Sequence, residues 1–185
     1  ERNGSLSKEQ YGSRKDHSAG IQALNHRLAF DLLRLEKRNA VDTAVDLRSC
    51  YALIAHAVAS LSMQRQGVPE ASIVCMFTTL QNMVHTVRTA FGDSTQTFGG
   101  DLWAIPMQPP PQGVGQGNGA GPAIWAVVST PVLEMMRSQG HGAVFRLAIS
   151  SQDVKLVGFA FVDDSDIIQT ATHLDGPIED LLEAA

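Results

Sequence analysis

The stretch Phe161-Val162-Asp163-Asp164 decides the fold of this chain, because it lies between two apolar runs that predict β-strands. Residues 156–160 (LVGFA) precede it and residues 165–169 (SDIIQ) follow it. Two adjacent acidic residues between strands predict a hairpin with polar turn residues. Their carboxylates repel each other unless a cation lies between them. Asp is also a favoured turn residue, so such a pair is common in turns that have no catalytic role.

Length and composition are those of an ordinary globular domain. The 185 residues suit one domain with a single core, and 44% of them are hydrophobic. No apolar run approaches the ~20 residues that a membrane span needs, and residues 1–17 lack the pattern of a signal peptide. The two cysteines, Cys50 and Cys75, have neither disulfide-framework nor metal-ligand spacing. We therefore expect an intracellular protein, in the cytoplasm or nucleus, without a membrane partner.

Charge is distributed unevenly along the chain. The formal net charge of −5 argues, taken alone, against nucleic-acid binding. Residues 1–48 nevertheless hold nine Lys and Arg against seven acidic residues, whereas residues 49–185 hold five against 12. A basic N-terminal part and an acidic remainder fit an enzyme that gathers carboxylates for metal and binds a polyanion elsewhere.

Periodicity predicts both helices and strands. Helices are expected over residues 18–38, 50–66 and 70–83, and from Pro122 to just before Gly140 with a kink at Pro131. Strands are expected over residues 44–47, 84–91, 97–105, 143–149 and 155–162, with a turn at residues 92–94 and a short acidic helix at the end of the chain. Because hairpins join the last strands, an antiparallel α+β sheet is favoured over a doubly wound parallel one.

The first expected helix has an apolar stripe. Ser18 can cap its N-terminus. The apolar residues at helical spacing are Ile21, Leu24, Leu28, Leu32 and Leu35, whereas Arg27, Arg34 and Arg38 occupy more polar positions. This pattern is typical of an amphipathic helix.

Asp46 and Tyr51 are candidate site residues. Asp46 ends a short apolar strand, a position where an Asp often only caps the following helix. The functional interpretation pairs Asp46 with Asp163 on adjacent strands, where each carboxylate supplies an oxygen to two metal ions. Tyr51 comes five residues after Asp46. Its alternative role is that of a core aromatic residue whose hydroxyl is hydrogen-bonded.

A proline- and glycine-rich run covers residues 106–122, which hold five of the eight prolines. Its main-chain N–H groups could cradle phosphates, and a flexible linker fits the run equally well. Gly117, preceded by Gln116, stands five residues before Pro122, where a helix is expected to start. Arg14-Lys15 fits a solvated charge pair. Neither a His-x-x-x-His zinc pattern nor a Gly-x-Ser-x-Gly hydrolase motif occurs.

Taken in order, four segments resemble the reverse transcriptase family, the RNA-directed DNA polymerases of retroelements. The segments are Tyr11-Gly12-Ser13-Arg14-Lys15, Asp46-Leu47-Arg48-Ser49-Cys50-Tyr51, Gln116-Gly117-x-x-x-Gly121-Pro122 and Phe161-Val162-Asp163-Asp164. They look like the family's fingers motif, its palm Asp with an aromatic residue, its Gln-Gly-x-x-x-Ser-Pro motif and its aromatic-x-Asp-Asp box. The four motifs resemble those of non-LTR retrotransposon or group II intron-like enzymes more than those of retroviral enzymes.

The resemblance implies a polymerase palm, in which an antiparallel sheet is flanked by helices, together with partial fingers. It implies that Asp46, Asp163 and Asp164 are catalytic, and that Asp46, Leu47, Asp163 and Asp164 bind two Mg²⁺ ions, which Mn²⁺ can replace. It also implies that Arg14, Tyr51, Gln116 and Gly117 bind the nucleotide, with Tyr51 as the steric gate against a ribose 2′-hydroxyl. The implied partners are an RNA template, a DNA primer and a deoxynucleoside triphosphate.

The chain also departs from the family's pattern. Ala52 stands where many relatives carry a second Asp, and Gly121 replaces the usual Ser. Counterparts of the Lys-bearing fingers strand, the Lys motif, the primer grip and the thumb are not visible, and residue 1 is Glu rather than Met. We therefore expect one reverse transcriptase domain truncated at both ends, with partial fingers over residues 1–41 and palm over residues 42–185. Whether such a fragment is active by itself stays open.

Two alternatives stay open beside the polymerase. A catalytically decayed or domesticated palm domain would act as a nucleic-acid-binding or scaffold module. Ala52 and the truncation favour this alternative slightly, whereas Tyr51 and the three retained acidic residues disfavour it. An RNA-templated RNA polymerase with the same palm is disfavoured by Tyr51, because an aromatic gate selects deoxynucleotides. The sequence leaves the template preference, any flanking endonuclease or RNase H domain, and the oligomeric state open.

Overall fold

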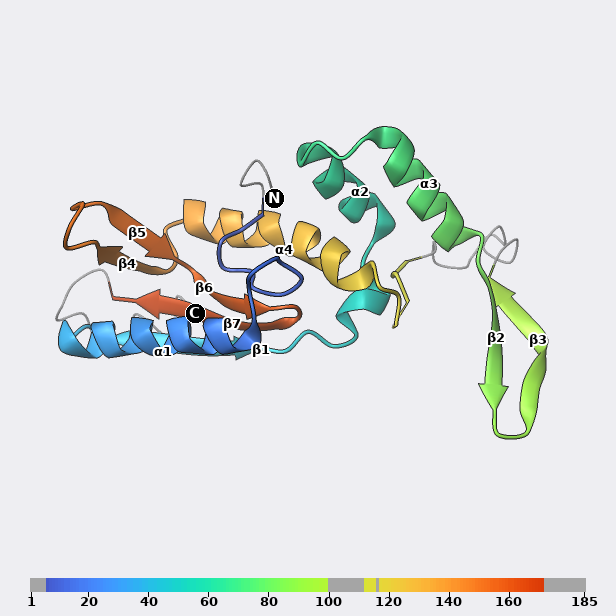
Figure 1. Cartoon of the computed structure of the whole chain (residues 1–185), viewed down its shortest axis with the longest axis horizontal. Helices are drawn as coiled ribbons and strands as arrows, with labels where there is room; N and C mark the ends of the chain where they lie inside the picture. Colours follow the sequence, from blue (N-terminus) through green and yellow to red (C-terminus); the bar gives the residue numbers. More distant parts are fainter. Residues whose placement is uncertain (1–5, 100–111, 116, 172–185) are drawn as a thin grey trace. The chain divides into compact units, whose positions relative to one another are not determined.

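The chain forms two compact units. The structure, a computed structural model, describes residues 6–99, 112–115 and 117–171. One unit comprises Glu1–Arg48 and Pro122–Ala185, and the other comprises Ser49–Gly121. Both combine helices with antiparallel strands (Figure 1), which confirms the expected α+β class. The division into fingers over residues 1–41 and palm over residues 42–185 stays a prediction.

The first unit contains two helices and five strands among its described residues. The helices are α1 (Ala19–Leu35) and α4 (Gly121–Ser138), of which Pro122 onward belongs to this unit. The strands are β1 (Ala40–Val45), β4 (Ala143–Arg146), β5 (Asp153–Leu156), β6 (Gly158–Phe161) and β7 (Asp164–Thr170). They form an antiparallel three-stranded sheet in the order β1-β7-β6 and a two-stranded sheet, β4-β5.

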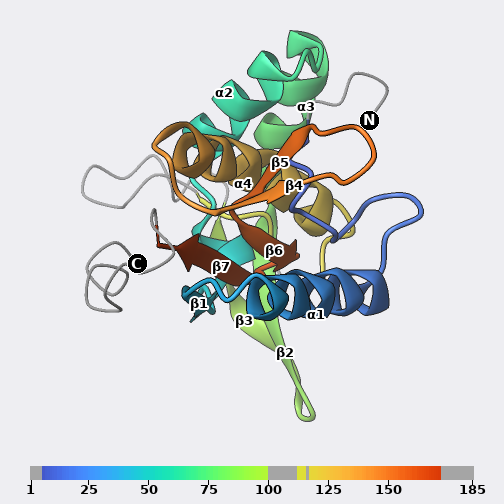
Figure 2. The ribbon, with the colours of Figure 1, turned by 90° about the vertical axis from the view of Figure 1, so that its left-hand side faces the viewer.

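The two helices cover opposite faces of the three-stranded sheet (Figure 2). On one face, the ring of Phe159 lies edge-on to the ring of His26 in α1, with centroids 5.3 Å apart. On the other face, Ile167 lines a cavity together with Trp125 of α4. Because successive strand residues point to opposite faces, Ile168 joins the core on the α1 side.

The core of this unit lies on the α1 side of the sheet. Its largest fully buried apolar side chains are Phe159, Leu33 and Ile168. Burying a side chain of this size stabilises the fold by about 1.5–3 kcal/mol. The apolar stripe of α1 described above lies on a different face of the helix, and its residues are 42–80% exposed.

The start of α1 was predicted correctly, and its end lies before the expected residue 38. The Ser18 hydroxyl accepts a hydrogen bond from the main-chain N–H of Ile21 at 3.2 Å, which is the expected cap. The helix ends at Leu35, and Lys37 takes a left-handed conformation (φ 52°). Arg38 lies outside the helix and donates to the main-chain oxygen of Val144 at 2.7 Å.

The single strand expected over residues 155–162 is wrong, because the chain changes partners within it. β5 pairs with β4, and β6 pairs with β7. Val157 lies between the two strands and is fully buried. Its main-chain oxygen accepts from Ile168 in β7 at 2.9 Å, so this residue marks the transfer from one sheet to the other. The strand expected over residues 143–149 is shorter, ending at Arg146.

The second unit contains short helices and a hairpin. Its elements are the 3₁₀-helix η1 (Cys50–Leu53), the helices α2 (His56–Arg65) and α3 (Glu70–Gln81), and the strands β2 (Val84–Thr89) and β3 (Gly92–Gly99). The continuous helix expected over residues 50–66 is therefore wrong. Ile54, between η1 and α2, is extended, and its main-chain oxygen accepts a hydrogen bond from the N–H of Gly113 at 2.7 Å. This contact with a residue distant in sequence stabilises the interruption between the two helices.

The β2–β3 hairpin also differs from the expectation. Residues 92–94 belong to β3 rather than to a turn, and the turn lies at Ala90 and Phe91. Residues 100–105 of the expected strand, most of the proline-rich run and the expected C-terminal acidic helix lie outside the described residues. Within the part of the chain that is described, no helix is long and apolar enough to cross a membrane.

Candidate functional site

Three acidic residues share one end of the three-stranded sheet. Val45, the last residue of β1, is the register partner of Ser165 in β7. Asp46 directly follows Val45, and Asp164 directly precedes Ser165. Asp163 stands next to Asp164 in the turn between β6 and β7. The antiparallel register therefore places all three residues at one end of the sheet, and their catalytic role stays a prediction. The strand expected over residues 44–47 is instead β1 (Ala40–Val45), so Asp46 lies just beyond its end.

The chemistry of these residues fits a hard cation. Asp46 and Asp164 are exposed and Asp163 is half-buried, and carboxylate oxygens are the ligands that Mg²⁺ prefers. Among residues 6–99, 112–115 and 117–171, no three His, Cys, Asp or Glu side chains converge as a group that could hold a metal ion. The predicted pair of Mg²⁺ ions, with Leu47 as a further ligand, stays a prediction.

The turn that carries Asp163 has a strained backbone. Val162 adopts a left-handed conformation with φ 60°. A β-branched residue in this region is a genuine outlier, because its side chain crowds the backbone. Such strain costs about 1–3 kcal/mol and persists only where the surroundings hold it.

Gln10 holds this turn through its side-chain amide. The amide oxygen accepts from the main-chain N–H groups of Val162 at 3.0 Å and Gly12 at 2.9 Å. The amide nitrogen donates to the main-chain oxygen of Val162 at 3.0 Å. Gln10 is 1% exposed, so these hydrogen bonds are shielded from water. One buried side chain thus binds both polar main-chain groups of the residue before Asp163.

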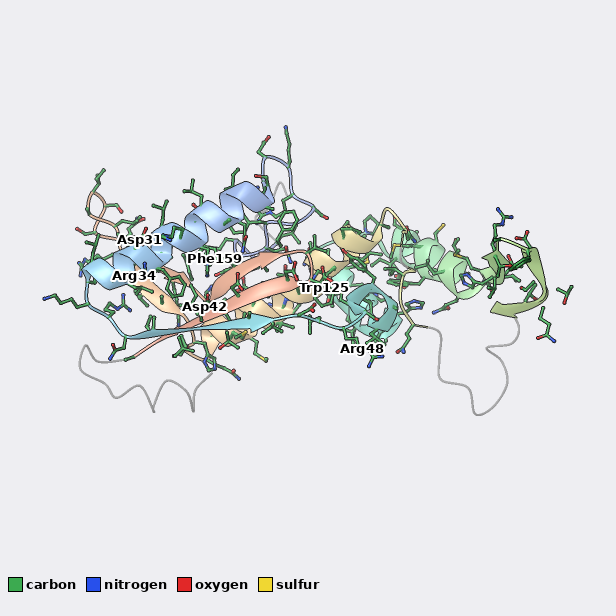
Figure 3. The ribbon with its side chains drawn as sticks, turned by 90° about the horizontal axis from the view of Figure 1, so that it is seen from below. Asp31, Arg34, Asp42, Arg48, Trp125 and Phe159 are labelled. Carbon is green, nitrogen blue, oxygen red and sulfur yellow. The ribbon has the colours of Figure 1, made fainter. Side chains whose placement is uncertain are left out.

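Trp125 and Gly12 complete this support. The indole N–H of Trp125 donates to the main-chain oxygen of Val162, and Trp125 lies near the turn end of the sheet (Figure 3). A side chain at Gly12 would overlap the main-chain nitrogen of Val162, so only glycine permits this close approach. We call Gln10, Gly12 and Trp125 together the turn support. Sequence reasoning identified neither Gln10 nor Trp125 as a site residue.

The loop that carries Gln10 is itself anchored by charge. Glu9 is fully buried and forms an ion pair with Arg137 of α4. Burial lowers the pKa of the Arg137 guanidinium, but hydrogen bonds to Glu9 and Glu134 outweigh burial and raise it. The main chain of Glu9 is also hydrogen-bonded to β6, because the N–H of Ala160 donates to the main-chain oxygen of Glu9 at 2.8 Å. The loop is therefore fixed against the strand that leads into the turn.

Arg14, predicted to contact a triphosphate, has partners within its own loop. Its guanidinium donates to the main-chain oxygens of Ser7 at 2.9 Å and Gln10 at 3.2 Å. The side chain is half-buried. Arg14 thus stabilises the segment that presents Gln10, and its contact with a nucleotide stays a prediction.

The other predicted nucleotide-binding residues lie in the second unit or outside the described residues. Tyr51 is half-buried, and its main-chain oxygen accepts from Val114 at 2.9 Å. A Cβ at Gly121 would lie 3.4 Å from the Tyr51 ring, so this glycine lies close to the aromatic residue. Gly117 is exposed, whereas Gln116 lies outside the described residues. The predicted roles of all three residues stay predictions.

An apolar cavity of about 310 Å³ lies between β1, β7 and α4. Leu47, which was expected to bind metal, lines this cavity together with Val45 and Trp125. Because Trp125 also binds the Val162 oxygen, the cavity adjoins the turn support.

Comparison with solved structures finds several chains of similar fold, one of which is a telomerase. No protein-family model matches the chain, and no curated protein matches it. The structure of apo telomerase from Candida tropicalis, truncated from its C-terminal domain, is similar with a TM-score of 0.43 and 14% sequence identity. The similarity covers 95% of this chain and 32% of that chain, so this chain spans about a third of the telomerase chain.

Proposed function

We propose that this chain carries the core of an RNA-directed DNA polymerase, which joins a deoxynucleoside triphosphate to the 3′-hydroxyl of a primer. The main support for this proposal is the pairing of β1 with β7. Val45 is the register partner of Ser165, Asp46 directly follows Val45, and Asp164 directly precedes Ser165. A polymerase of this kind needs acidic residues from two neighbouring strands at the same end of the sheet. The four sequence segments that resemble reverse transcriptases support the same proposal.

The acidic residues would hold the metal. Asp46, Asp163 and Asp164 would bind Mg²⁺ ions through carboxylate oxygens, with Leu47 as a further ligand. When bound, Mg²⁺ lowers the pKa of an attacking hydroxyl and neutralises charge on the leaving pyrophosphate. Arg14, Tyr51, Gln116 and Gly117 would orient the nucleotide, and the partners would be an RNA template and a DNA primer.

The turn support would position the acidic residues that bind the metal ions. A functional constellation must be held within about 0.5 Å of its working geometry. Gln10 binds both main-chain polar groups of Val162, and Asp163 is the next residue. In this proposal, Gln10 and Trp125 are positioning residues, because by holding Val162 they set the direction of the carboxylates of Asp163 and Asp164.

Metal binding tests the proposal without relying on activity. We expect Mn²⁺ to broaden the amide resonances of Asp46, Asp163 and Asp164 in NMR spectra of the chain. Asp163→Asn should weaken this effect strongly, because a neutral amide lacks the charge that binds the ion. Asp153→Asn, in the separate β4–β5 sheet, is the matched control and should behave like the wild type.

Primer extension then tests the reaction. With an RNA template, a DNA primer and Mg²⁺, the wild type should extend the primer and Asp163→Asn should not. Extension by Asp163→Asn at the wild-type rate would exclude the polymerase proposal. Nucleic-acid binding with neither primer extension nor Mn²⁺ broadening at Asp46, Asp163 and Asp164 would instead support a decayed palm that acts as a binding module.

The sugar selectivity tests Tyr51. If its ring excludes a 2′-hydroxyl by overpacking, worth about 1–3 kcal/mol, Tyr51→Ala should raise relative ribonucleotide incorporation roughly ten- to a hundredfold. Tyr51→Phe keeps the ring and should keep the selectivity. If Tyr51→Ala leaves the selectivity for deoxynucleotides over ribonucleotides unchanged, Tyr51 is a core aromatic residue and not a steric gate.

A further inference from the structure

One face of α1 is an apolar surface that is exposed among the described residues. Its members are Ile21, Leu24, Leu28, Leu32 and Leu35, with exposed fractions of 42%, 57%, 50%, 46% and 80%. The helix packs into the core through other residues, chiefly Ala29 and Leu33. Monomeric proteins rarely expose a contiguous apolar surface of this kind, which marks an interaction site. We call these five residues the α1 stripe.

The spacing of the α1 stripe is symmetric about its central residue. The intervals between its members are three, four, four and three residues, with Leu28 in the middle. In an antiparallel pair of α1 helices with a two-fold axis at Leu28, Leu28 would meet Leu28 of the partner subunit. Ile21 would meet Leu35 of the partner subunit, and Leu24 would meet Leu32 of the partner subunit. Such a self-complementary surface is what a two-fold symmetric dimer requires.

The charges beside the α1 stripe fit the same arrangement. Arg27 and Asp31 lie on one flank and form an ion pair within the helix, with Nε and Oδ2 3.1 Å apart. In an antiparallel pair, the same flanks of the two helices face each other. Arg27 stands one residue before Leu28 and Asp31 three residues after it, so the opposite charges of two copies differ in height by about 3 Å. Arg27 can therefore also pair with Asp31 of the partner subunit.

The apolar surface continues beyond the helix. Leu28 and Leu32 also line a groove of about 240 Å³ with Phe145, Leu147 and Val154 of the β4–β5 region. A specific interface usually buries about 800 Å² on each partner, and the groove adds apolar area to what one helix face supplies. We propose that two copies of this chain form a dimer in which their α1 helices pack antiparallel about Leu28.

Sedimentation equilibrium tests the dimer directly. Over a range of about 1–200 μM, the wild type should convert from monomer to dimer. Leu28→Glu places two carboxylates opposite each other on the axis and should weaken association at least about tenfold. Leu61→Glu adds the same charge at another exposed leucine, on α2, and should leave association unchanged. A wild type that stays monomeric, or a Leu28→Glu variant that dimerises equally well, would overturn the proposal.

Cysteine cross-linking tests the orientation of the helices. Cys75 is exposed and Cys50 is buried, so Cys75→Ser removes the reactive native thiol. In that background, a mixture of Ile21→Cys and Leu35→Cys chains should form a mixed disulfide on oxidation, because the two positions meet across the axis. Ile21→Cys alone should not form a disulfide dimer. Efficient cross-linking of Ile21→Cys alone would indicate parallel helices and overturn the antiparallel pairing, whatever the enzymatic activity of the chain.

Discussion

Replacing Gln10 by Met should loosen the turn that carries Asp163 without emptying the space that the Gln10 side chain fills. Met has a similar length and shape but lacks the amide. The main-chain N–H groups of Val162 and Gly12 would then lose their acceptor. The Val162 oxygen would keep the indole N–H of Trp125 as its donor. The change also removes the 3.4 Å hydrogen bond from the Gln10 amide nitrogen to the Ser129 hydroxyl, so its main effect falls on the polar contacts at the strained residue.

The magnitude follows from the unpaired groups. Each donor left without a partner costs about 1–3 kcal/mol, which makes about 2–6 kcal/mol for two. Relaxation of Val162 from its left-handed conformation would return about 1–2 kcal/mol. The central values, about 4 and about 1.5 kcal/mol, leave a net loss of about 2–3 kcal/mol, and we expect Gln10→Met to lower the free energy of unfolding of the first unit by about this amount. Gln64→Met, at an exposed position on α2, should change it by less than about 0.5 kcal/mol.

Native-state hydrogen exchange at the amides of Gly12 and Val162, together with urea unfolding, measures this loss. A double-mutant cycle with Val162→Gly isolates the strain, because glycine adopts positive φ freely. If Gln10 holds the strained turn, the two changes should couple by about 0.5–3 kcal/mol. A Gln10→Met variant as stable as Gln64→Met, or strict additivity in the cycle, would refute the reasoning.

Three further outcomes follow from contacts elsewhere in the chain. Arg137→Met leaves the buried carboxylate of Glu9 without its ion-pair partner, and urea unfolding should show a loss of about 3–5 kcal/mol. Gly158→Ala puts a methyl group onto a main-chain oxygen of β7, so the melting temperature should fall, in line with an overpacking cost of about 1–3 kcal/mol. A hydrogen bond from Arg88 lowers the pKa of Asp93; Arg88→Met should therefore raise that pKa in an NMR carboxyl titration, and an unchanged value would contradict the pairing.

Elements defined by local chemistry were predicted well. Ser18 was recognised as the cap of α1 because its hydroxyl binds an N–H only three residues away. The α3 helix begins at Glu70, directly after Pro69, as the sequence indicated. The hairpin around Asp163 was also expected, since two apolar runs and the polar turn between them are visible within a few positions.

Elements that depend on distant partners were not predicted. The break between η1 and α2 reflects a hydrogen bond from Gly113 to Ile54, and the interruption at Val157 reflects a change from one sheet to the other. Each contact joins residues that are far apart in the sequence or exchanges one strand partner for another. Helical periodicity likewise identified the apolar stripe of α1, but spacing cannot tell whether the chain covers that face itself.

The amino-acid sequence by itself determined which residues are candidates: Asp46 at the end of one strand and Asp163 and Asp164 in a turn between two others. Those assignments rest on interactions within a few residues. Only the tertiary structure decided that β1 pairs with β7 in the register that brings these acids to one sheet edge. It alone revealed that Gln10 and Trp125 bind the main chain of Val162. Hydrogen bonds between residues so distant in sequence leave no periodic trace, because they form only once the backbone has folded.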